Sequence, residues 1–255
     1  MAALSMREAL AGYAGRRVFV TGHTGFKGSW LAFLLAEVGA DVTGYALPPE
    51  SSPNHFELLG LEPRVRHVVG DVRDGAALSA ALHEAAPEFV FHLAAQALVR
   101  RAYADPVATF ATNVLGTVNV LEAARGCPSV RSLVCITSDK CYENVEWPWG
   151  YRENDALGGH DPYSASKAAA ELAFSAYRRS YLAADAKLGA ATTRAGNVIG
   201  GGDWSPDRIV PDCVRAASTG APIRLRHPGA TRPWQHVLEP VSGYVLLGAA
   251  LAASP

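Results

Sequence analysis

The fold of this chain is decided by residues 17–28, which read RVFVTGHTGFKG. The first five of them form an apolar run typical of a buried strand, and a glycine-rich turn follows at once. A helical pattern then extends from about Lys27 to Val38. A glycine loop that joins a strand to a helix in this way indicates a dinucleotide-binding fold, in which the loop holds a pyrophosphate.

The loop has the spacing GxxGxxG, with Gly22, Gly25 and Gly28. These glycines permit a tight turn and a close approach of the backbone to a phosphate, which then meets the N-terminus of the helix. A strand-to-helix turn can also need one glycine for a positive φ alone, but the flanking strand and helix favour the binding role. The residues expected to contact the cofactor here are Gly22, Thr24, Gly25, Phe26, Lys27 and Gly28.

Outward from the loop, strand-like runs alternate with longer helical patterns. Strands are expected at RVFVT, DVTGYAL, VRHVVGDV, EFVFHLAA, SLVCITS and AATTRAGNV, with helices near 27–38, 75–86, 106–125 and 162–183. This alternation predicts an α/β fold with a doubly wound parallel Rossmann sheet over residues 1–199. The alternation stops near Gly200. Residues 200–255 are expected to form a small substrate-binding region, with loops and one or two short helices over the carboxyl ends of the strands.

Composition excludes several classes of protein. With 255 residues, of which 49% are apolar and 18% charged, the chain can bury a sizeable core and is not disordered. Its formal net charge is −1, without long runs of one sign, which argues against binding to nucleic acid or to an anionic membrane.

The N-terminal residues lack the apolar core of a signal peptide and are expected to form a short helix. The apolar stretch Val241–Ala253 is too short to span a bilayer, so we expect a soluble, cytoplasmic protein.

The four cysteines, Cys127, Cys135, Cys141 and Cys213, form no CxxC pair, and two of them fall in or beside an apolar strand pattern. They are expected to be reduced thiols of the core, which fits the cytoplasm. No disulfide and no metal site is predicted from them.

Further cofactor contacts are expected where later strands end. Asp71 and Val72 follow the third strand, where a carboxylate could meet an adenine amino group or could form only a turn or helix cap. The second strand ends in Gly44–Pro48, without the usual acidic residue for the ribose and without an arginine for a 2′-phosphate, so NAD is modestly favoured over NADP. Small residues expected beside the cofactor end the fourth strand: Leu93, Ala94, Ala95 and Gln96.

Tyr163 and Lys167 lie four residues apart, on one face of the helix expected at 162–183. An ammonium near a phenol, together with a positive nicotinamide ring, favours the phenolate. Tyr163 is therefore expected to have a lowered pKa and to remove a hydroxyl proton as hydride leaves for NAD⁺. The same spacing also occurs by chance on surface helices, but here it follows the fifth strand of a predicted dinucleotide fold.

Ser138, Asp139 and Lys140 stand at the end of the fifth strand. Ser138 is a candidate to hydrogen-bond the reacting hydroxyl. Asp139 and Lys140 place an acid and a base side by side, where a plain oxidoreductase or epimerase of this fold needs neither. Acid/base chemistry beyond hydride transfer is therefore implied.

Four long strings extend these motifs: TGHTGFKGSW, SDKCYENVEWPWGYRENDALGGHDPYSASKAAAEL, RAGNVIGGGDWSPDRIVPD and RPWQHVLEP. Together they resemble the CDP-glucose 4,6-dehydratases, a group of NAD-dependent nucleotide-sugar enzymes among the extended short-chain dehydrogenase/reductases. The match runs from about Arg17 to the end of the chain. The SDKCYEN, GGDW and RPWQHV blocks set this group apart from the dTDP-glucose dehydratases, which carry a glutamate where Lys140 stands.

The resemblance implies that water is removed from CDP-glucose to give CDP-4-keto-6-deoxyglucose, with NAD reduced and reoxidised within one cycle. Tyr163, helped by Ser138 and Lys167, would take the C4 hydroxyl proton. Lys140 would take the C5 proton, and Asp139 would protonate the departing C6 hydroxyl. This division requires a neutral Lys140, through burial or through the nearby Lys167, and the pair could also share the roles differently.

The resemblance also assigns binding residues. Asn113 is similar to a family asparagine that orders the active-site lysine and a water, or else it is a plain helix-face residue. Three further residues are expected to contact the cofactor: Asn113, Tyr163 and Lys167. Arg208 and Arg232 suit bidentate contact with a diphosphate, or else they are packed loop residues. The residues implied for the substrate are Asn197, Arg208, Arg232 and His236.

Two further features follow by analogy with the family. A homodimer would form through the helices near 106–125 and 162–183. Family members are longer than this chain, so the substrate-binding region is expected to be incomplete.

Two alternatives share parts of the pattern. An epimerase, or a dehydratase of another nucleotide sugar, would keep the glycine loop and the Tyr163/Lys167 pair, although Asp139 and Lys140 argue against the epimerase. A noncatalytic NAD-binding protein would keep the glycine loop alone. It would have little reason to retain Ser138 together with the Asp139/Lys140 and Tyr163/Lys167 pairs.

Overall fold

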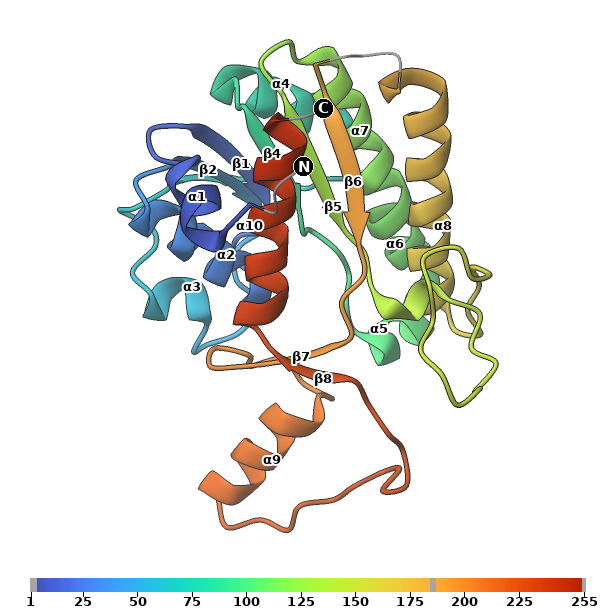
Figure 1. Cartoon of the computed structure of the whole chain (residues 1–255). Helices are drawn as coiled ribbons and strands as arrows, with labels where there is room; N and C mark the ends of the chain where they lie inside the picture. Colours follow the sequence, from blue (N-terminus) through green and yellow to red (C-terminus); the bar gives the residue numbers. More distant parts are fainter. Residues whose placement is uncertain (1–3, 184–186, 254–255) are drawn as a thin grey trace.

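The core of the protein is a sheet of six parallel strands, shown in Figure 1. The computed structural model describes residues 4–183 and 187–253. The strand order is β3-β2-β1-β4-β5-β6, which is that of a doubly wound sheet, so the predicted fold class is confirmed. The strands are β1 Arg17–Thr21, β2 Asp41–Ala46, β3 Arg66–Val69, β4 Phe89–His92, β5 Ser132–Ile136 and β6 Gly189–Thr193.

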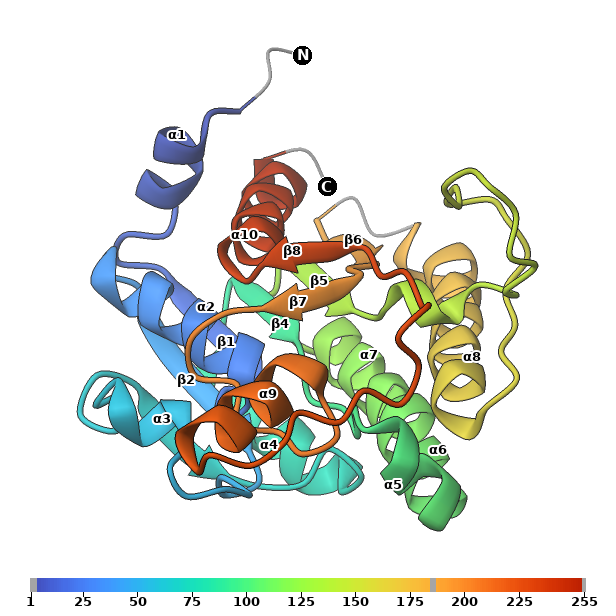
Figure 2. The ribbon, with the colours of Figure 1, turned by 90° about the horizontal axis from the view of Figure 1, so that it is seen from below.

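Helices cover both faces of this sheet. One face carries α1 Met6–Ala11, α2 Phe26–Glu37 and α10 Leu238–Ala253. The other carries α4 Gly75–Ala85, α7 Gly116–Gly126 and α8 Pro162–Tyr177, and Figure 2 shows α7 and α8 side by side. The shorter helical pieces are α3 His55–Leu58, α5 Val99–Ala104, α6 Pro106–Phe110, η1 Ala111–Leu115, η2 Asp139–Cys141 and η3 Arg178–Leu182.

The strand residues alternate between two apolar cores. Val18 and Val20 of β1 belong to the core under α2 and α10, whereas Phe19 between them belongs to the core under α4 and α7. Strand β4 repeats this pattern, with Phe91 on the first side and Val90 on the second. Successive side chains of a strand point to opposite faces, so a sheet that is covered on both sides requires continuous apolar runs. The sequence has such runs in its central strands.

Helix α10 belongs to the sheet and not to the region over the strand ends. Val241 and Val245 are fully buried, and the Tyr13 hydroxyl donates a 2.8 Å hydrogen bond to the carbonyl of Val245. The expected placement of all residues beyond Gly200 over the strand ends is therefore wrong for α10, which packs on β5, β6 and α2. A helix that is apolar around most of its circumference is buried most completely on a sheet. The division into a Rossmann domain at 1–199 and a substrate-binding region at 200–255 stays a prediction. Helix α10 belongs to the second range in sequence but packs on the first.

The remaining C-terminal elements do lie beyond the carboxyl ends of the strands (Figure 1). They are α9 Ile209–Ser218 and a two-stranded parallel sheet of β7 Asn197–Ile199 and β8 Trp234–His236. These elements enclose the end of the main sheet at which ligands bind in doubly wound folds.

Helices α3 and α5 lie in segments for which no helix is predicted. The Asn54 side chain accepts a 2.9 Å hydrogen bond from the Glu57 amide and thereby caps α3. The helix expected near 106–125 is α6, η1 and α7 in series, and the helix expected near 162–183 is α8 followed by η3.

The cysteines are free, and Cys127, Cys135 and Cys141 are buried, as predicted, whereas Cys213 is partly exposed. Over residues 4–183 and 187–253, none of the helices combines the length and the apolar character that a membrane crossing requires.

Replacement of Val241 by alanine should lower the free energy of unfolding by about 2 kcal/mol, because two methyl groups are lost from a fully buried site between α10 and the sheet. Leu238→Ala changes the same helix at a residue that is 44% exposed, and it should cost less than about 0.5 kcal/mol. Urea unfolding followed by circular dichroism measures both values. Equal effects of the two substitutions would show that α10 is not part of the core.

Candidate active site

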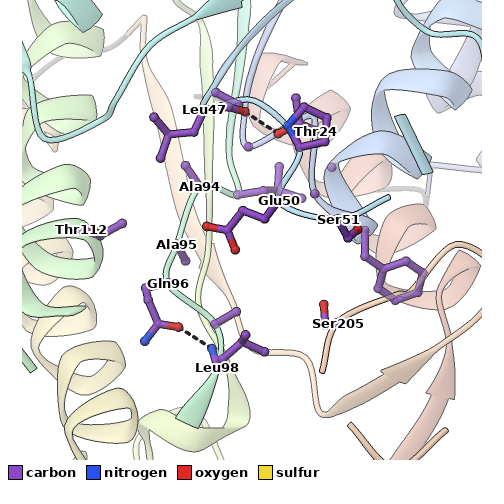
Figure 3. A pocket seen from close by; sticks show the side chains of 18 of the residues that line it. Thr24, Leu47, Glu50, Ser51, Ala94, Ala95, Gln96, Leu98, Thr112 and Ser205 are labelled. Atoms are coloured by element: carbon purple, nitrogen blue, oxygen red, sulfur yellow. Dashed lines mark hydrogen bonds between the residues drawn. The ribbon is translucent and has the colours of Figure 1, made fainter. Parts of the chain in front are cut away.

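A cleft of ≈ 350 Å³ lies at the carboxyl ends of β1, β2 and β4. The glycine loop, the segments after β2, β3 and β4, and the loop before α9 line it. Figure 3 shows this cleft with Thr24 and Leu47 on one wall and Ala95 and Gln96 on another. The predicted cofactor residues that line it are Gly22, Thr24, Gly25, Phe26, Lys27, Gly28, Asp71, Val72, Leu93, Ala94, Ala95 and Gln96.

Two of the three loop glycines are required by the fold itself. Gly22 has a φ of +75°, and a Cβ atom there would lie 2.7 Å from the backbone nitrogen of Ala94. A Cβ atom on Gly28 would lie 2.1 Å from the carbonyl oxygen of Gly22, so α2 could not pack against the loop. Gly25 differs, because its φ is −81° and its Cβ atom would lie 3.4 Å from the same oxygen. The fold tolerates a side chain at Gly25, so the glycine leaves room for a ligand at the N-terminus of α2.

Asn113 ties the end of β4 to α8. It is 2% exposed and lies in the π-helical turn η1, a kind of distortion that is frequent at functional sites. Its Oδ1 accepts a 2.8 Å hydrogen bond from the Gln96 amide, and its Nδ2 donates to the Gln96 carbonyl at 3.0 Å and to Ser166 Oγ at 2.8 Å. Asn113 is therefore a buried clamp behind Gln96, which lines the cleft, and does not itself line it. Its contact with the cofactor stays a prediction.

Asp71 lines the cleft while its carboxylate is held by Arg73. Oδ1 accepts a 2.9 Å hydrogen bond from the Arg73 amide, and the Arg73 guanidinium pairs with both oxygens. These hydrogen bonds, chiefly that from the Arg73 side chain, lower the pKa of Asp71. Asp71 thus forms a turn with Arg73 and also lines the cleft, so the two roles considered for it, a turn residue and a cofactor contact, are compatible.

Glu50 is a cleft residue for which no role is predicted from the sequence. The segment after β2 carries no carboxylate up to Pro48, but the lining continues through Glu50 and Ser51. The carboxylate of Glu50 extends into the cleft (Figure 3) and pairs with Arg101 of α5 at 2.8 Å. An acidic residue shortly after the second strand is the signal that could have found it, since ribose hydroxyls are bound there in this fold.

Tyr163 and Lys167 are brought together at the end of β5. Asp161 caps α8 by accepting hydrogen bonds from the amides of Tyr163 and Ser164 at 3.0 Å each, which fixes the start of the helix. Tyr163 is 9% exposed and Lys167 is 6% exposed. Lys167 Nζ lies 3.5 Å from the carbonyl oxygen of Ile136, the last residue of β5. The pair therefore faces the sheet and not solvent.

Burial dominates the pKa values of this pair. It raises the pKa of Tyr163, although the Ser138 hydroxyl and the charge of Arg208 act in the opposite direction. It lowers the pKa of Lys167 to about 8, against the attraction of Glu171. Without the positive nicotinamide ring, the expected lowering of the Tyr163 pKa is thus wrong. Among the protein groups, desolvation of the phenolate outweighs the charges around it.

Asp139 and Lys140 form an ion pair next to Ser138. Lys140 Nζ lies 3.2 Å from Asp139 Oδ2, and Ser138 Oγ donates a 3.0 Å hydrogen bond to Asp139 Oδ1. The Lys140 side chain is 40% exposed. The structure therefore brings the predicted acid and base together, and it does not bury Lys140 deeply, which was one of the two conditions named for a neutral Lys140.

Lys27 and Arg208 add positive charge to the same site. Burial lowers the pKa of Lys27 to about 7, and the charges of Lys167 and Arg208 lower it further. Lys27 Nζ lies 3.4 Å from the Tyr244 hydroxyl, so α10 reaches the glycine loop. Arg208 lines the cleft, and its guanidinium is held by Asp203 at 2.9 Å.

The other predicted substrate residues lie outside the lining of the cleft. Arg232 and His236 are exposed; Arg232 Nη1 donates to the adjacent Thr231 carbonyl at 2.7 Å, and His236 Nδ1 accepts from the Leu238 amide at 3.3 Å. Asn197 is partly buried at the start of β7, which pairs with the strand that carries His236. Of the four, Arg208 alone lines the cleft, and the roles of the others stay predictions.

The model of the NAD dependent epimerase/dehydratase family matches residues 18–255. The chain belongs to the NAD-dependent epimerase/dehydratase family. Within this family it is 51% identical over 239 residues to a CDP-glucose 4,6-dehydratase from Salmonella typhimurium, covering 92% of this chain and 67% of that protein. It is 29% identical over 230 residues to a dTDP-glucose 4,6-dehydratase from Xanthomonas campestris, of which it spans 63%.

Solved members of the epimerase/dehydratase family have the same fold. A dTDP-glucose 4,6-dehydratase from Streptomyces venezuelae with NAD bound is 29% identical, with a TM-score of 0.80 over 91% of this chain and 72% of that chain. An epimerase from Methanothermobacter thermautotrophicus is 26% identical, with a TM-score of 0.81 over 96% of this chain and 71% of that chain.

Gly25→Val should weaken NAD binding about tenfold or more, because the new side chain would occupy the space left for the pyrophosphate at the start of α2. The free energy of unfolding should change by less than about 1 kcal/mol, since the backbone there is extended. Gly243→Ala in α10 faces open space and serves as the control with unchanged affinity. Titration calorimetry and urea unfolding measure the two quantities, and normal NAD affinity in Gly25→Val would count against the site.

Proposed function

We propose that this protein removes water from CDP-glucose to give CDP-4-keto-6-deoxyglucose, with NAD as its resident cofactor. The observation that carries the proposal is the Asp139–Lys140 pair directly after Ser138, since hydride transfer alone needs no such acid and base. The identity of 51% to a CDP-glucose 4,6-dehydratase, against 29% to a dTDP-glucose 4,6-dehydratase, supports CDP-glucose as the substrate.

The first step is oxidation at C4 of the sugar. Tyr163 takes the proton of the C4 hydroxyl, and Ser138 holds that hydroxyl by a hydrogen bond. Lys167 stabilises the phenolate of Tyr163 through its ammonium group, one helical turn away. When bound, NAD⁺ supplies the hydride acceptor for this step, the hydride donor for the last one, and a positive charge that favours the phenolate.

Elimination is the task of the ion pair. A proton shift from Lys140 to Asp139, whose charged atoms are 3.2 Å apart, converts the pair into a neutral amine and a carboxylic acid. Lys140 then removes the C5 proton, which the 4-keto group has made acidic, and Asp139 protonates the C6 hydroxyl as it leaves as water. Both residues return to their charged forms, so this step needs no outside acid or base. The Lys140 ammonium, whose protons exchange with solvent, would then return a proton to C5 as C6 is reduced.

The positive charge around the cleft suits the diphosphate of a nucleotide sugar. Arg208 lines the cleft next to Lys27, and an arginine can hold a phosphate through two hydrogen bonds. We propose Asn197, Arg232 and His236 as further substrate residues on the strength of the sequence resemblance. The free thiols of the core fit a reducing compartment, which supports a cytoplasmic location.

We also propose that two copies associate through α6, η1 and α8. Large apolar side chains on these elements are exposed, with Val107 79%, Leu115 49% and Leu172 60% exposed. Exposed apolar residues that gather on neighbouring helices are typical of a subunit interface.

Incubation with CDP-glucose in heavy water should give a product that has lost water and gained one solvent deuterium at C5, detected by mass spectrometry. The UDP, dTDP and GDP sugars, tested in parallel, should react more slowly. Asp139→Asn should reduce the rate at least about a hundredfold, since general acid catalysis contributes a factor of that order. Intact CDP-glucose in the presence of bound NAD would point to a noncatalytic relative, and an inverted C4 hydroxyl would point to an epimerase.

Val107→Glu combined with Leu172→Glu should convert the dimer into a monomer, because two charges per subunit would have to be buried in the apolar contact. Light scattering after size-exclusion chromatography measures the mass. Leu58→Glu, at a residue of α3 that is 63% exposed, is the matched control and should leave the mass unchanged. A monomeric unaltered protein would refute the proposed interface.

A further inference from the structure

A buried carboxylate, Glu171, lies behind Lys167 and has no part in the reaction steps above. It is 4% exposed and stands one helical turn after Lys167 on α8. Its Oε2 accepts hydrogen bonds from Thr192 Oγ1 at 3.0 Å and from Arg194 Nη2 at 2.8 Å, and its Oε1 accepts one from Thr137 Oγ1. The carboxylate therefore connects α8 with the ends of β5 and β6, directly beneath the proposed catalytic groups.

Arg194 extends this network to the loop that follows Lys140. Its Nη1 donates hydrogen bonds to the Tyr142 hydroxyl and to the Glu153 carbonyl, at 3.0 Å each, and its guanidinium carbon lies 4.9 Å from the centre of the Tyr142 ring. The hydrogen bond to Glu171 raises the pKa of Arg194 further, so the arginine stays charged. Tyr142 follows the short helix η2, and that helix contains both Asp139 and Lys140.

Glu171 supplies the negative charge for this buried site. Burial holds His92 neutral, with a pKa of about 3, and raises the pKa of the Cys141 thiol to about 12. The pKa of Cys135 is raised by burial as well, and that of Lys27 is lowered to about 7. The titratable or charged groups that face Lys167 or the neighbouring Glu171 are Tyr163, His92, Cys135, Cys141, Lys27, Glu171 and Arg194.

We propose that Glu171 is a positioning residue whose carboxylate keeps Lys167 in its ammonium form and whose partner Arg194 holds the Tyr142 loop next to Asp139 and Lys140. A buried ammonium needs a buried counter-charge, and Glu171 is its neighbour on the same helix face. The proposal rests on the proposed function, since it assigns Lys167 the role of charged partner to Tyr163.

The sequence offers a direct test, because the chain has four lysines: Lys27, Lys140, Lys167 and Lys187. Protein grown with lysine labelled with ¹³C at Cε gives four NMR signals, which single Lys→Arg substitutions assign. Glu171→Gln should lower the titration midpoint of Lys167 by about one pH unit, because an opposite charge near a buried amine is lost. Thr192→Val removes a neutral hydrogen bond from the same carboxylate, and it should leave that midpoint unchanged.

A second readout is the pH dependence of turnover. The pKa of Lys167 is about 8, so the ammonium form is complete at pH 6.5 and is lost as the pH rises through that value. In the Glu171→Gln variant the ammonium form of Lys167 is lost at lower pH. The kcat of this variant, divided by that of the unaltered protein, should therefore be closer to one at pH 6.5 than at pH 8. The NMR titration needs no turnover, so failure of the dehydratase proposal and failure of this one are distinguishable.

An unchanged or raised Lys167 midpoint in folded Glu171→Gln would overturn the proposal. If that variant does not fold, Arg194→Met provides a test in which the titration midpoint shifts the other way. It removes the cation that now pairs with Glu171, so the carboxylate acts on Lys167 without a competing positive charge. Its Lys167 midpoint should rise, and an unchanged or lower midpoint would overturn the proposal equally.

Discussion

The structure depends on the contact between the start of α2 and the end of β1. At Gly28 the helix lies so close to the carbonyl of Gly22 that even one methyl group would have to move the backbone. Because the helix packs this closely, its N-terminus faces the cleft and its apolar side covers β1, the third strand of six. The position of the cleft follows from this one backbone contact.

Much of this arrangement could be predicted because its signals are local. Strands that are buried on both faces must be apolar throughout, and the glycine loop needs its residues at fixed spacing. The gathering of the catalytic candidates could be predicted as well, since Ser138, Asp139 and Lys140 follow the end of β5, and Tyr163 and Lys167 lie on the next long helix along the chain. Residues whose placement depends on distant partners were missed. Glu50 reaches the cleft on a loop tied to Arg101, and Glu171 meets Arg194 across two elements.

Electrostatics could be predicted least of all, because burial decides it. The phenol of Tyr163 and the ammonium of Lys167 were expected to stabilise each other's charges. In the fold, burial shifts both pKa values toward the neutral form, raising that of Tyr163 and lowering that of Lys167 to about 8. Lys27 lines the cleft, and burial lowers its pKa in the same way, to about 7. An anionic ligand would favour the ammonium form of Lys27, and binding of a diphosphate would then be coupled to proton uptake.

The position of α10 has a consequence for synthesis on the ribosome. Tyr13 and Val245, which share a hydrogen bond, are separated by 232 residues of chain. Until α10 emerges, the sheet face that it covers at β5 and β6 is open, and apolar side chains such as Phe91 and Val134 remain accessible to water and to other chains. Contacts of such high sequence separation form slowly, and exposed strands favour association between nascent molecules. This family member therefore completes this face of its sheet only after the residues of α10, Leu238–Ala253, have been made.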